Sequence, residues 1–210
     1  MERIKALNGG IAIQARMAYA GEYFVERYGP EKARQAPPVK KMLEMGLPVG
    51  AGTDGTRVAS YNPWPAIYWL ITGKTVGGLQ LAEEENRLTR EEALGLYTKG
   101  SAWISKEEGV KGTLEKGMYA DFALLDRDFF SIPEEEIRDL EAVLTVVDGK
   151  VYALGAEGKL SVLDADTGKL IWSKDFKADY GAETPVWGFS AHPYVRGDTV
   201  YCIVGGEGSV

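Results

Sequence analysis

Residues 47–54 read Leu-Pro-Val-Gly-Ala-Gly-Thr-Asp, a short apolar run that ends in small residues and then in a carboxylate. A proline-rich helix start follows at Asn62-Pro63. Buried parallel strands deliver acids to the rim of α/β barrels in this way, because the functional groups of such barrels lie at the carboxyl ends of the strands. The stretch therefore predicts a parallel strand with Asp54 at its functional end.

Two further elements precede this strand. Ile11-Ala-Ile-Gln14 predicts a short buried strand behind a turn at Gly9-Gly10. Pro37-Pro38 opens a helix that Gly46 ends, because proline suits a first helical turn and glycine suits the residue after the last one. Since that helix leads directly into residues 47–54, we expect an αβ unit.

Helix signals continue after Asp54. Asn62 can cap a helix that begins at Pro63 and ends before Gly73. Thr89-Arg-Glu-Glu92 is a capping-box pattern that opens another helix. The first half of the chain is thus predicted to alternate strands with helices.

From Gly109 onward the pattern becomes that of strands. Residues 119–126 and 143–147 are predicted strands, and Asp148-Gly149 is a strong hairpin signal before the next one. Between them, residues 133–140 are acidic and predict a short surface helix.

The composition is that of a globular protein, with 45% hydrophobic and 26% charged residues and a formal net charge of −7. Because no basic stripe is present to neutralise phosphates, we expect no nucleic-acid partner. No run of ~18 apolar residues and no secretory signal are visible, so we expect no membrane partner and, by default, a cytoplasmic location. One cysteine, Cys202, forbids an internal disulfide and is predicted to be a buried strand thiol.

Four segments, in this order, resemble the C-terminal part of a metal-dependent amidohydrolase of the amidohydrolase superfamily, in the subgroup that acts on N-substituted amides. The resemblance covers residues 1–150 and implies the last part of a TIM-like (β/α)8 barrel with strands of a small β-domain. The segments are Gly50-Ala-Gly-Thr-Asp54 (end of the eighth barrel strand), Asn62-Pro-Trp64, Thr89 to Trp103 (the following helix), and Gly112-Thr-Leu-Glu-Lys-Gly-Met-Tyr-Ala-Asp121 (the closing motif).

This resemblance implies that Asp54 is catalytic. In the family, the acid at this position lies beside a divalent metal such as zinc, takes a proton from the metal-bound water, and often ligates the metal as well. From the residues alone, Asp54 could instead cap the next turn or helix through hydrogen bonds from backbone N–H groups.

The other metal ligands of the family have no counterpart in this sequence. They are a His-x-His pair on the first strand, a Lys or Glu on the fourth, and histidines on the fifth and sixth, whereas the sequence starts at a segment that resembles the seventh. Asp54 is therefore expected to bind metal only if another chain supplies the missing ligands. Glu83-Glu-Glu85 could join Asp54 in a carboxylate-only site, or could form a solvated surface loop.

Four other residues stay open between a site role and a structural role. Gln14 ends a strand and could face a barrel mouth, or it could be an ordinary hydrogen-bonding residue. Trp64, Tyr68 and Trp69 would line or cover the pocket of an intact relative, or would pack in a core.

A second resemblance covers residues 151–210. Leu163-Asp-Ala-Asp-Thr-Gly-Lys-Leu-Ile-Trp172 resembles the signature of quinoprotein (PQQ)-type β-propeller blades, with a turn at Asp164 to Gly168 and Trp172 docking between blades. Residues 151–158 are echoed by residues 200–208, a period that suits one blade. PQQ itself is not expected to bind. The single histidine, His192, is expected to be a structural or surface residue.

These observations predict an α/β plus β fold in three parts: a partial amidohydrolase barrel at 1–108, a small composite β-domain segment at 109–150, and about one propeller blade with part of a second at 151–210. The predicted function is metal-dependent hydrolysis of non-peptide C–N bonds, inactive in this chain alone because the histidine ligands are absent. The alternative is a non-catalytic remnant, or an interaction or scaffold module, from a fusion of two truncated genes. Exposed sheet edges predict self-association, and a small-molecule substrate is expected only if the site is completed.

Overall fold

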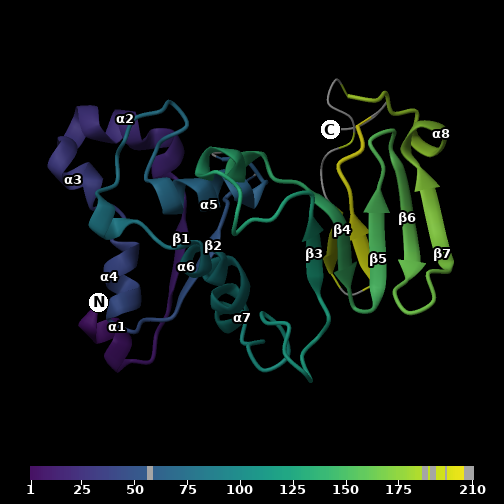
Figure 1. Cartoon of the computed structure of the whole chain (residues 1–210), viewed down its shortest axis with the longest axis horizontal. Helices are drawn as coiled ribbons and strands as arrows, with labels where there is room; N and C mark the ends of the chain where they lie inside the picture. Colours follow the sequence, from purple (N-terminus) through teal and green to yellow (C-terminus); the bar gives the residue numbers. More distant parts are fainter. Residues whose placement is uncertain (56–58, 186–188, 190–192, 197, 206–210) are drawn as a thin grey trace. The chain divides into compact units, whose positions relative to one another are not determined.

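The computed structural model describes residues 1–55, 59–185, 189, 193–196 and 198–205 (Figure 1). The chain divides into two compact units. Strands from the segments 109–150 and 151–210 pair in a single sheet. Unit 1 comprises Met1–Met118 and Arg127–Leu140, and unit 2 comprises Tyr119–Asp126 and Glu141–Val210.

Unit 1 contains a two-stranded parallel sheet made of β1 (Ile11–Gln14) and β2 (Val49–Gly52). Ile11 lies opposite Val49, and Gln14 lies opposite Gly52. Parallel strands need a crossover connection. Here it runs through three helices, so the predicted αβ unit is present: α2 (Met17–Tyr28), α3 (Pro30–Arg34) and α4 (Val39–Glu44).

The helices that follow β2 begin at the capping residues that the sequence indicates. Asn62 accepts a hydrogen bond of 3.0 Å from the N–H of Trp64, and Gly73 ends the same helix at a φ of 69°. Thr89 and Glu92 form the predicted capping box. These helices are α5 (Pro63–Thr72) and α6 (Arg90–Gly95), with the 3-10 helix η1 (Glu84–Asn86) between them and α7 (Ser101–Ile104) after them, and a short helix, α1 (Glu2–Ala6), precedes β1.

The longest helix among the described residues, α2, has 12 residues. Within the described part of the chain, no helix combines the length and the apolar character that crossing a membrane requires.

Between α6 and α7 the helix widens into a π-helical segment, η2 (Leu96–Gly100). The sequence pattern did not predict this segment. π-helical turns are rare and frequently lie at functional sites. Both η2 and α7 pack against β2, so this unusual turn lies beside the strand that leads to Asp54.

The acidic segment at 133–140 forms the 3-10 helix η3 (Glu134–Asp139). It was predicted as a short surface helix, and Glu134 and Glu135 are exposed. However, Ile137 and Leu140 are fully buried, because η3 packs on α5. The apolar residues of this segment therefore belong to the core of unit 1.

Unit 2 is built on a five-stranded antiparallel sheet with the strand order β3-β4-β5-β6-β7 (Figure 1). The hairpin between the second and third strands has the predicted turn, with positive φ at both Asp148 (51°) and Gly149 (68°). The strands are β3 (Phe122–Leu125), β4 (Ala142–Val147), β5 (Lys150–Leu154), β6 (Lys159–Asp164) and β7 (Leu170–Asp175).

The turn between β6 and β7 also forms as predicted. The Asp164 carboxylate accepts hydrogen bonds from the N–H and the hydroxyl of Thr167, and Gly168 adopts a φ of 68°. These bonds, the one from the Thr167 hydroxyl most of all, lower the pKa of Asp164. Trp172 lies on β7 opposite the fully buried Val162 and is 37% exposed.

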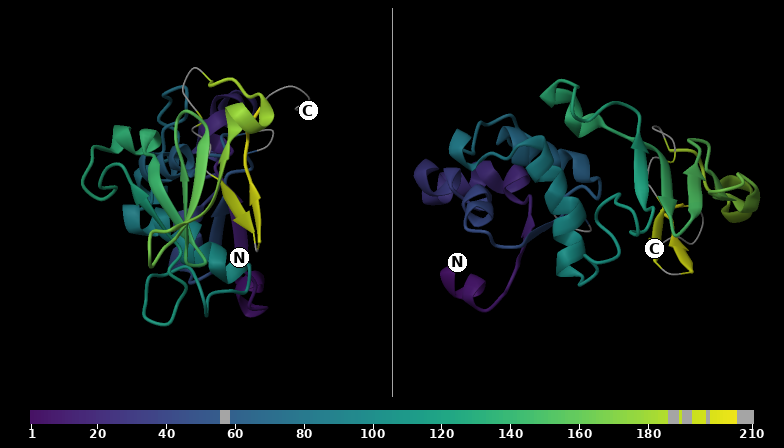
Figure 2. Two further views of the ribbon diagram at one scale, coloured as in Figure 1. Left: turned by 90° about the vertical axis from the view of Figure 1, so that its right-hand side faces the viewer. Right: turned by 60° about the horizontal axis from the view of Figure 1, so that its bottom comes forward.

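The core of unit 2 forms between the sheet and the segments that follow it. The helix α8 (Phe176–Tyr180) and the hairpin of β8 (Tyr194–Arg196) and β9 (Thr199–Tyr201) belong to these segments (Figures 1 and 2). Cys202 is half-buried just after β9, and burial raises the pKa of its thiol. The buried cluster consists of Leu160, Phe176, Ala182 and Phe189, with Leu154, Val200, Cys202 and Val204 packed against it.

Candidate functional site

The candidate site lies at the carboxyl ends of β1 and β2. Because the strands are parallel, both carboxyl ends meet at one edge of the sheet. Gln14 is the last residue of β1 and pairs with Gly52, the last residue of β2. Asp54 follows two residues later and is exposed. The structure thus brings the two sequence candidates Gln14 and Asp54 to the same edge.

Asp54 has an unusual backbone conformation, with a φ of 56°. Within the described ranges, its carboxylate makes no hydrogen bond and no ion pair. Asp54 therefore does not cap α5, because the side chain of Asn62 does so. The carboxylate is left available for another partner.

Three contacts from η2 and α7 hold the end of β2. The Ser101 hydroxyl shares its proton between the carbonyls of Ala51, at 3.1 Å, and Leu96, at 2.9 Å. The Tyr97 hydroxyl lies 3.4 Å from the Gly52 carbonyl. Gly100 approaches the strand so closely that a Cβ there would lie 2.1 Å from the Val49 carbonyl oxygen. Sequence reasoning missed these contacts.

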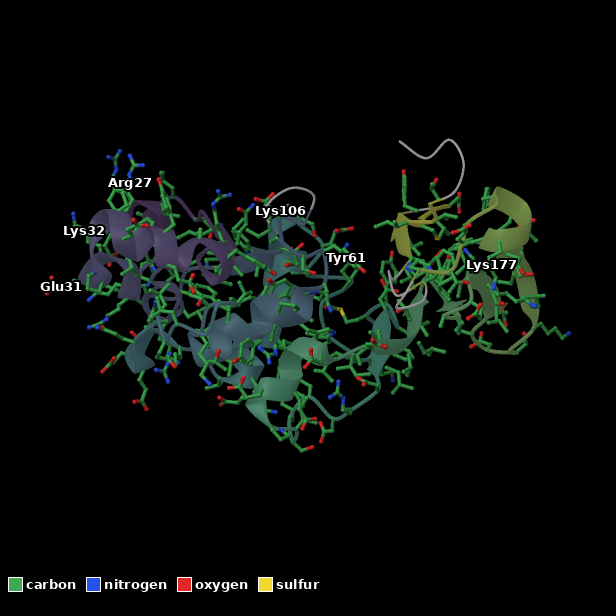
Figure 3. All side chains as sticks on the ribbon, turned by 90° about the horizontal axis from the view of Figure 1, so that it is seen from above. Arg27, Glu31, Lys32, Tyr61, Lys106 and Lys177 are labelled. Carbon is green, nitrogen blue, oxygen red and sulfur yellow. The ribbon has the colours of Figure 1, made fainter. Side chains whose placement is uncertain are left out.

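A second tyrosine contacts the segment that follows Asp54. The N–H of Ser60 donates a 3.3 Å hydrogen bond to the hydroxyl of Tyr19. Gly55 lies directly against the backbone of Tyr61, since a Cβ on Gly55 would be 2.6 Å from the Tyr61 Cα. Tyr61 itself is exposed on the segment that leads to α5 (Figure 3).

The hydroxyl of Tyr97 has a raised pKa. Burial raises the pKa of Tyr97 well above its ordinary value, and the neighbouring Tyr19 adds to the rise. Tyr97 is therefore protonated at neutral pH, and its hydroxyl donates to the Gly52 carbonyl.

The other sequence candidates lie elsewhere in unit 1. Glu83 forms an ion pair of 3.9 Å with Arg34, and Glu84 and Glu85 are exposed on η1. Trp64, Tyr68 and Trp69 are all buried on α5. The Tyr68 hydroxyl donates a 2.6 Å hydrogen bond to Glu135, and burial, followed by this carboxylate, raises the pKa of Tyr68. His192 lies outside the described residues.

The described residues do not by themselves fit a metal ion. Catalytic zinc takes about three protein ligands. No group of three or more histidine, cysteine, aspartate or glutamate side chains gathers anywhere in the described part of the chain. The carboxylate-only site of Asp54 with Glu83 to Glu85 is therefore not formed, and Asp54 stands as a single carboxylate.

This arrangement of strand, acid and following helices has counterparts among known proteins. Residues 1–153 match the family model described as the amidohydrolase family. The chain belongs to the amidohydrolase family. Residues 99–210 match a second model, of the PQQ type and described as outer membrane protein assembly factor BamB, which suggests a PQQ-like repeat. The two matches overlap between residues 99 and 153.

Similar curated proteins carry amidohydrolase-type names. An N-substituted formamide deformylase of Arthrobacter pascens is 32% identical over 112 residues, which are 53% of this chain and 20% of that protein. The putative amidohydrolase YtcJ of Bacillus subtilis is 29% identical over 61% of this chain and 25% of its own length. The chain thus spans about a fifth to a quarter of these relatives.

A solved structure supports the same relationship. An uncharacterized metal-dependent hydrolase from Pyrococcus horikoshii aligns with a TM-score of 0.55 and 28% identity, over 64% of this chain and 27% of that one. Hydrolase ancestry and part of an amidohydrolase fold are therefore shown for this chain.

Proposed function

We propose that this chain contributes the acid of a metal-dependent hydrolase site that cleaves non-peptide C–N bonds. The observation that carries the proposal is the position of Asp54, an exposed carboxylate just beyond the carboxyl end of a parallel strand in an amidohydrolase chain. A carboxylate at such an edge can accept a proton from a reacting group or ligate a cation.

The proposed substrates are N-substituted amides. Support comes from the name of a relative, an N-substituted formamide deformylase, which is 32% identical over 112 residues. Gln14, at the same edge, offers an amide donor and acceptor that could orient an amide substrate.

We propose that this chain is inactive alone. Asp54 is a single carboxylate without further metal-ligating side chains among the described residues. A divalent metal, zinc by family, would need its other ligands from another polypeptide, and a small molecule would bind only in that completed site. No reaction step through a metal can be assigned to this chain's own residues.

The second candidate function is a non-catalytic scaffold or interaction module that arose by fusion of two truncated genes. The observation that favours it is the composite sheet of unit 2. Strands β3 and β4 lie within the overlap of the two family matches, β5 crosses its end, and the sheet continues into β6 and β7. In this reading the blade is a structural element that binds no PQQ, and the chain resides in the cytoplasm.

An assay of a reconstituted complex separates the two functions. The chain is mixed with the part of the Arthrobacter pascens deformylase that its match leaves out, and formate release from an N-substituted formamide is followed. The hydrolase proposal expects turnover with the wild-type chain and loss with Asp54→Asn. Equal rates with the two chains, or a complex without turnover, would support the scaffold.

A further inference from the structure

Asp54 adopts a left-handed backbone conformation that side-chain-bearing residues seldom take. Such conformations persist only where the surrounding structure holds them, and they gather at functional sites. The groups that hold the backbone on both sides of Asp54 are therefore candidates for a contribution to the site.

On the N-terminal side of Asp54, η2 and α7 pack against the last residues of β2. In a parallel pair, the carbonyls of alternate residues face the partner strand, and the Ile11 N–H bonds the Pro48 carbonyl at 2.9 Å. The carbonyls of Val49 and Ala51 consequently point away from β1. The Val49 carbonyl contacts Gly100, and the Ala51 carbonyl accepts a hydrogen bond from the Ser101 hydroxyl. The Tyr97 hydroxyl donates to the carbonyl of Gly52, the last residue of β2.

On the C-terminal side, two contacts limit where the chain can go. Gly55, directly after Asp54, is pressed against the backbone of Tyr61. Ser60 is held by the Tyr19 hydroxyl. Asp54 thus lies between two anchored stretches, and each anchor includes a tyrosine hydroxyl.

We propose that Tyr97 and Ser101, with Tyr19 on the other side, are positioning residues that hold Asp54 in its left-handed conformation. The π-helical turn η2 places the side chains of Tyr97 and Ser101 at the end of β2. The meaning of this positioning for catalysis rests on the proposed function, but the conformational effect does not. If these bonds merely attached a helix to a strand, losing them would lower stability and leave the conformation of Asp54 unchanged.

The same helical segment offers two matched controls. Ser105 lies four residues after Ser101 at the end of α7, and its hydroxyl bonds the carbonyls of Ser101 and Ala102 and the Glu107 carboxylate, none of which lies on β2. Thr98 follows Tyr97, and its hydroxyl bonds the Leu94 carbonyl at 3.0 Å. Ser105→Ala and Thr98→Val therefore remove helix hydroxyls that do not contact β2.

The test measures the one-bond Cα–Hα coupling of Asp54 by NMR in the full chain, since this coupling reports a positive φ. We expect a positive-φ value in the wild type, Ser105→Ala and Thr98→Val, and a shift toward ordinary values in Tyr97→Phe with Ser101→Ala. Amide hydrogen exchange of residues 53–55 should rise about tenfold in the same double variant, because two hydrogen bonds that limit local opening are lost.

An unchanged coupling in the double variant would overturn the proposal. The single variants Tyr97→Phe, Ser101→Ala and Tyr19→Phe are measured separately, so that the question is answered even if the double variant does not fold. The chain is studied without metal or substrate, so the result does not depend on hydrolysis. If the reconstituted complex is inactive but the coupling shifts, the proposed function fails and the positioning stands.

Discussion

Gln14 lies directly opposite Gly52 in the parallel ladder of β1 and β2. This pairing fixes the register of the two strands and brings Gln14 and Asp54 to one edge of the sheet. A slip of one residue would turn every side chain of a strand to the other face. The pairing therefore determines which polar groups meet where a substrate could bind.

The close packing of η2 on β2 depends on Gly100. A Cβ there would lie 2.1 Å from the Val49 carbonyl, so Gly100→Ala should destabilise unit 1 by about 1–3 kcal/mol, despite the better helix propensity of alanine. Gly95→Ala is the matched control, because its Cβ would meet only Lys99 at an ordinary 3.5 Å. We expect this variant to gain about 0.5–1 kcal/mol. Amide hydrogen exchange of unit 1 in denaturant measures the stability change of each variant. Equal changes in the two variants would contradict a close contact between Gly100 and β2.

Two substitutions at Asp54 should show separately how the charge and the backbone conformation of this residue affect the free energy of unfolding. Asp54→Asn should change the free energy of unfolding by less than about 0.5 kcal/mol, because the carboxylate bonds nothing among the described residues and asparagine tolerates positive φ. Asp54→Ala should lower the free energy of unfolding by about 1–2 kcal/mol, since the Cβ of alanine makes the left-handed backbone conformation unfavourable. Urea unfolding checks both values. A large loss in Asp54→Asn would show that the carboxylate is a structural group.

Much of unit 1 could be predicted because its signals are local. The caps at Asn62 and Thr89, the glycines after helices, and the strand that leads to Asp54 all depend on residues a few positions apart. The contacts of Tyr97 and Ser101 with β2 could not be predicted, because they depend on how a helix docks on a strand about 50 residues away. The small residues Gly50 and Gly100 were the available signal, since glycines permit close approach of backbones.

The way in which the strands of unit 2 join into one sheet was harder to predict for a related reason. Sequence patterns show that β4 and β5 form a hairpin, but not that β6 and β7 extend the same sheet. Which strand edges meet is decided by tertiary packing. The apolar residues in and after η3 illustrate the same limit. A few buried side chains in an acidic segment do not form a periodic hydrophobic pattern from which their burial could be predicted.

Acid should weaken the link between α4 and α6. Burial opposes ionisation of Glu92, but its bonds to Lys40 and to the Thr89 N–H outweigh burial and lower the pKa of Glu92. A lowered folded-state pKa contributes stability above the ordinary value of about 4.3, and that contribution is lost as the pH falls through the lowered pKa. We expect unit 1 to lose stability between about pH 5 and pH 3 and Glu92→Gln to show a flatter profile. A profile identical to the wild type would contradict this link.

Self-association through the open edge of β7 is a further prediction. All six residues of β7 are exposed, and the strand pairs only with β6 among the described strands. The bond from the Phe176 N–H to the Gly158 carbonyl sets the alternation of the ladder, so the Ser173 N–H points away from β6. Ser173→Pro should leave unit 2 folded and shift the molar mass by light scattering toward the monomer. A wild-type chain that is monomeric at micromolar concentration would contradict the prediction.

The most direct test of Asp54 as the acid of a completed metal site is the zinc content per chain after purification from zinc-containing buffer, with molar mass measured by light scattering. We expect no stoichiometric zinc in the chain alone. We expect about one zinc per chain in the complex with the unmatched part of the deformylase, and none when the chain carries Asp54→Asn. Stoichiometric zinc in the isolated chain, or zinc in the complex that survives Asp54→Asn, would contradict this prediction.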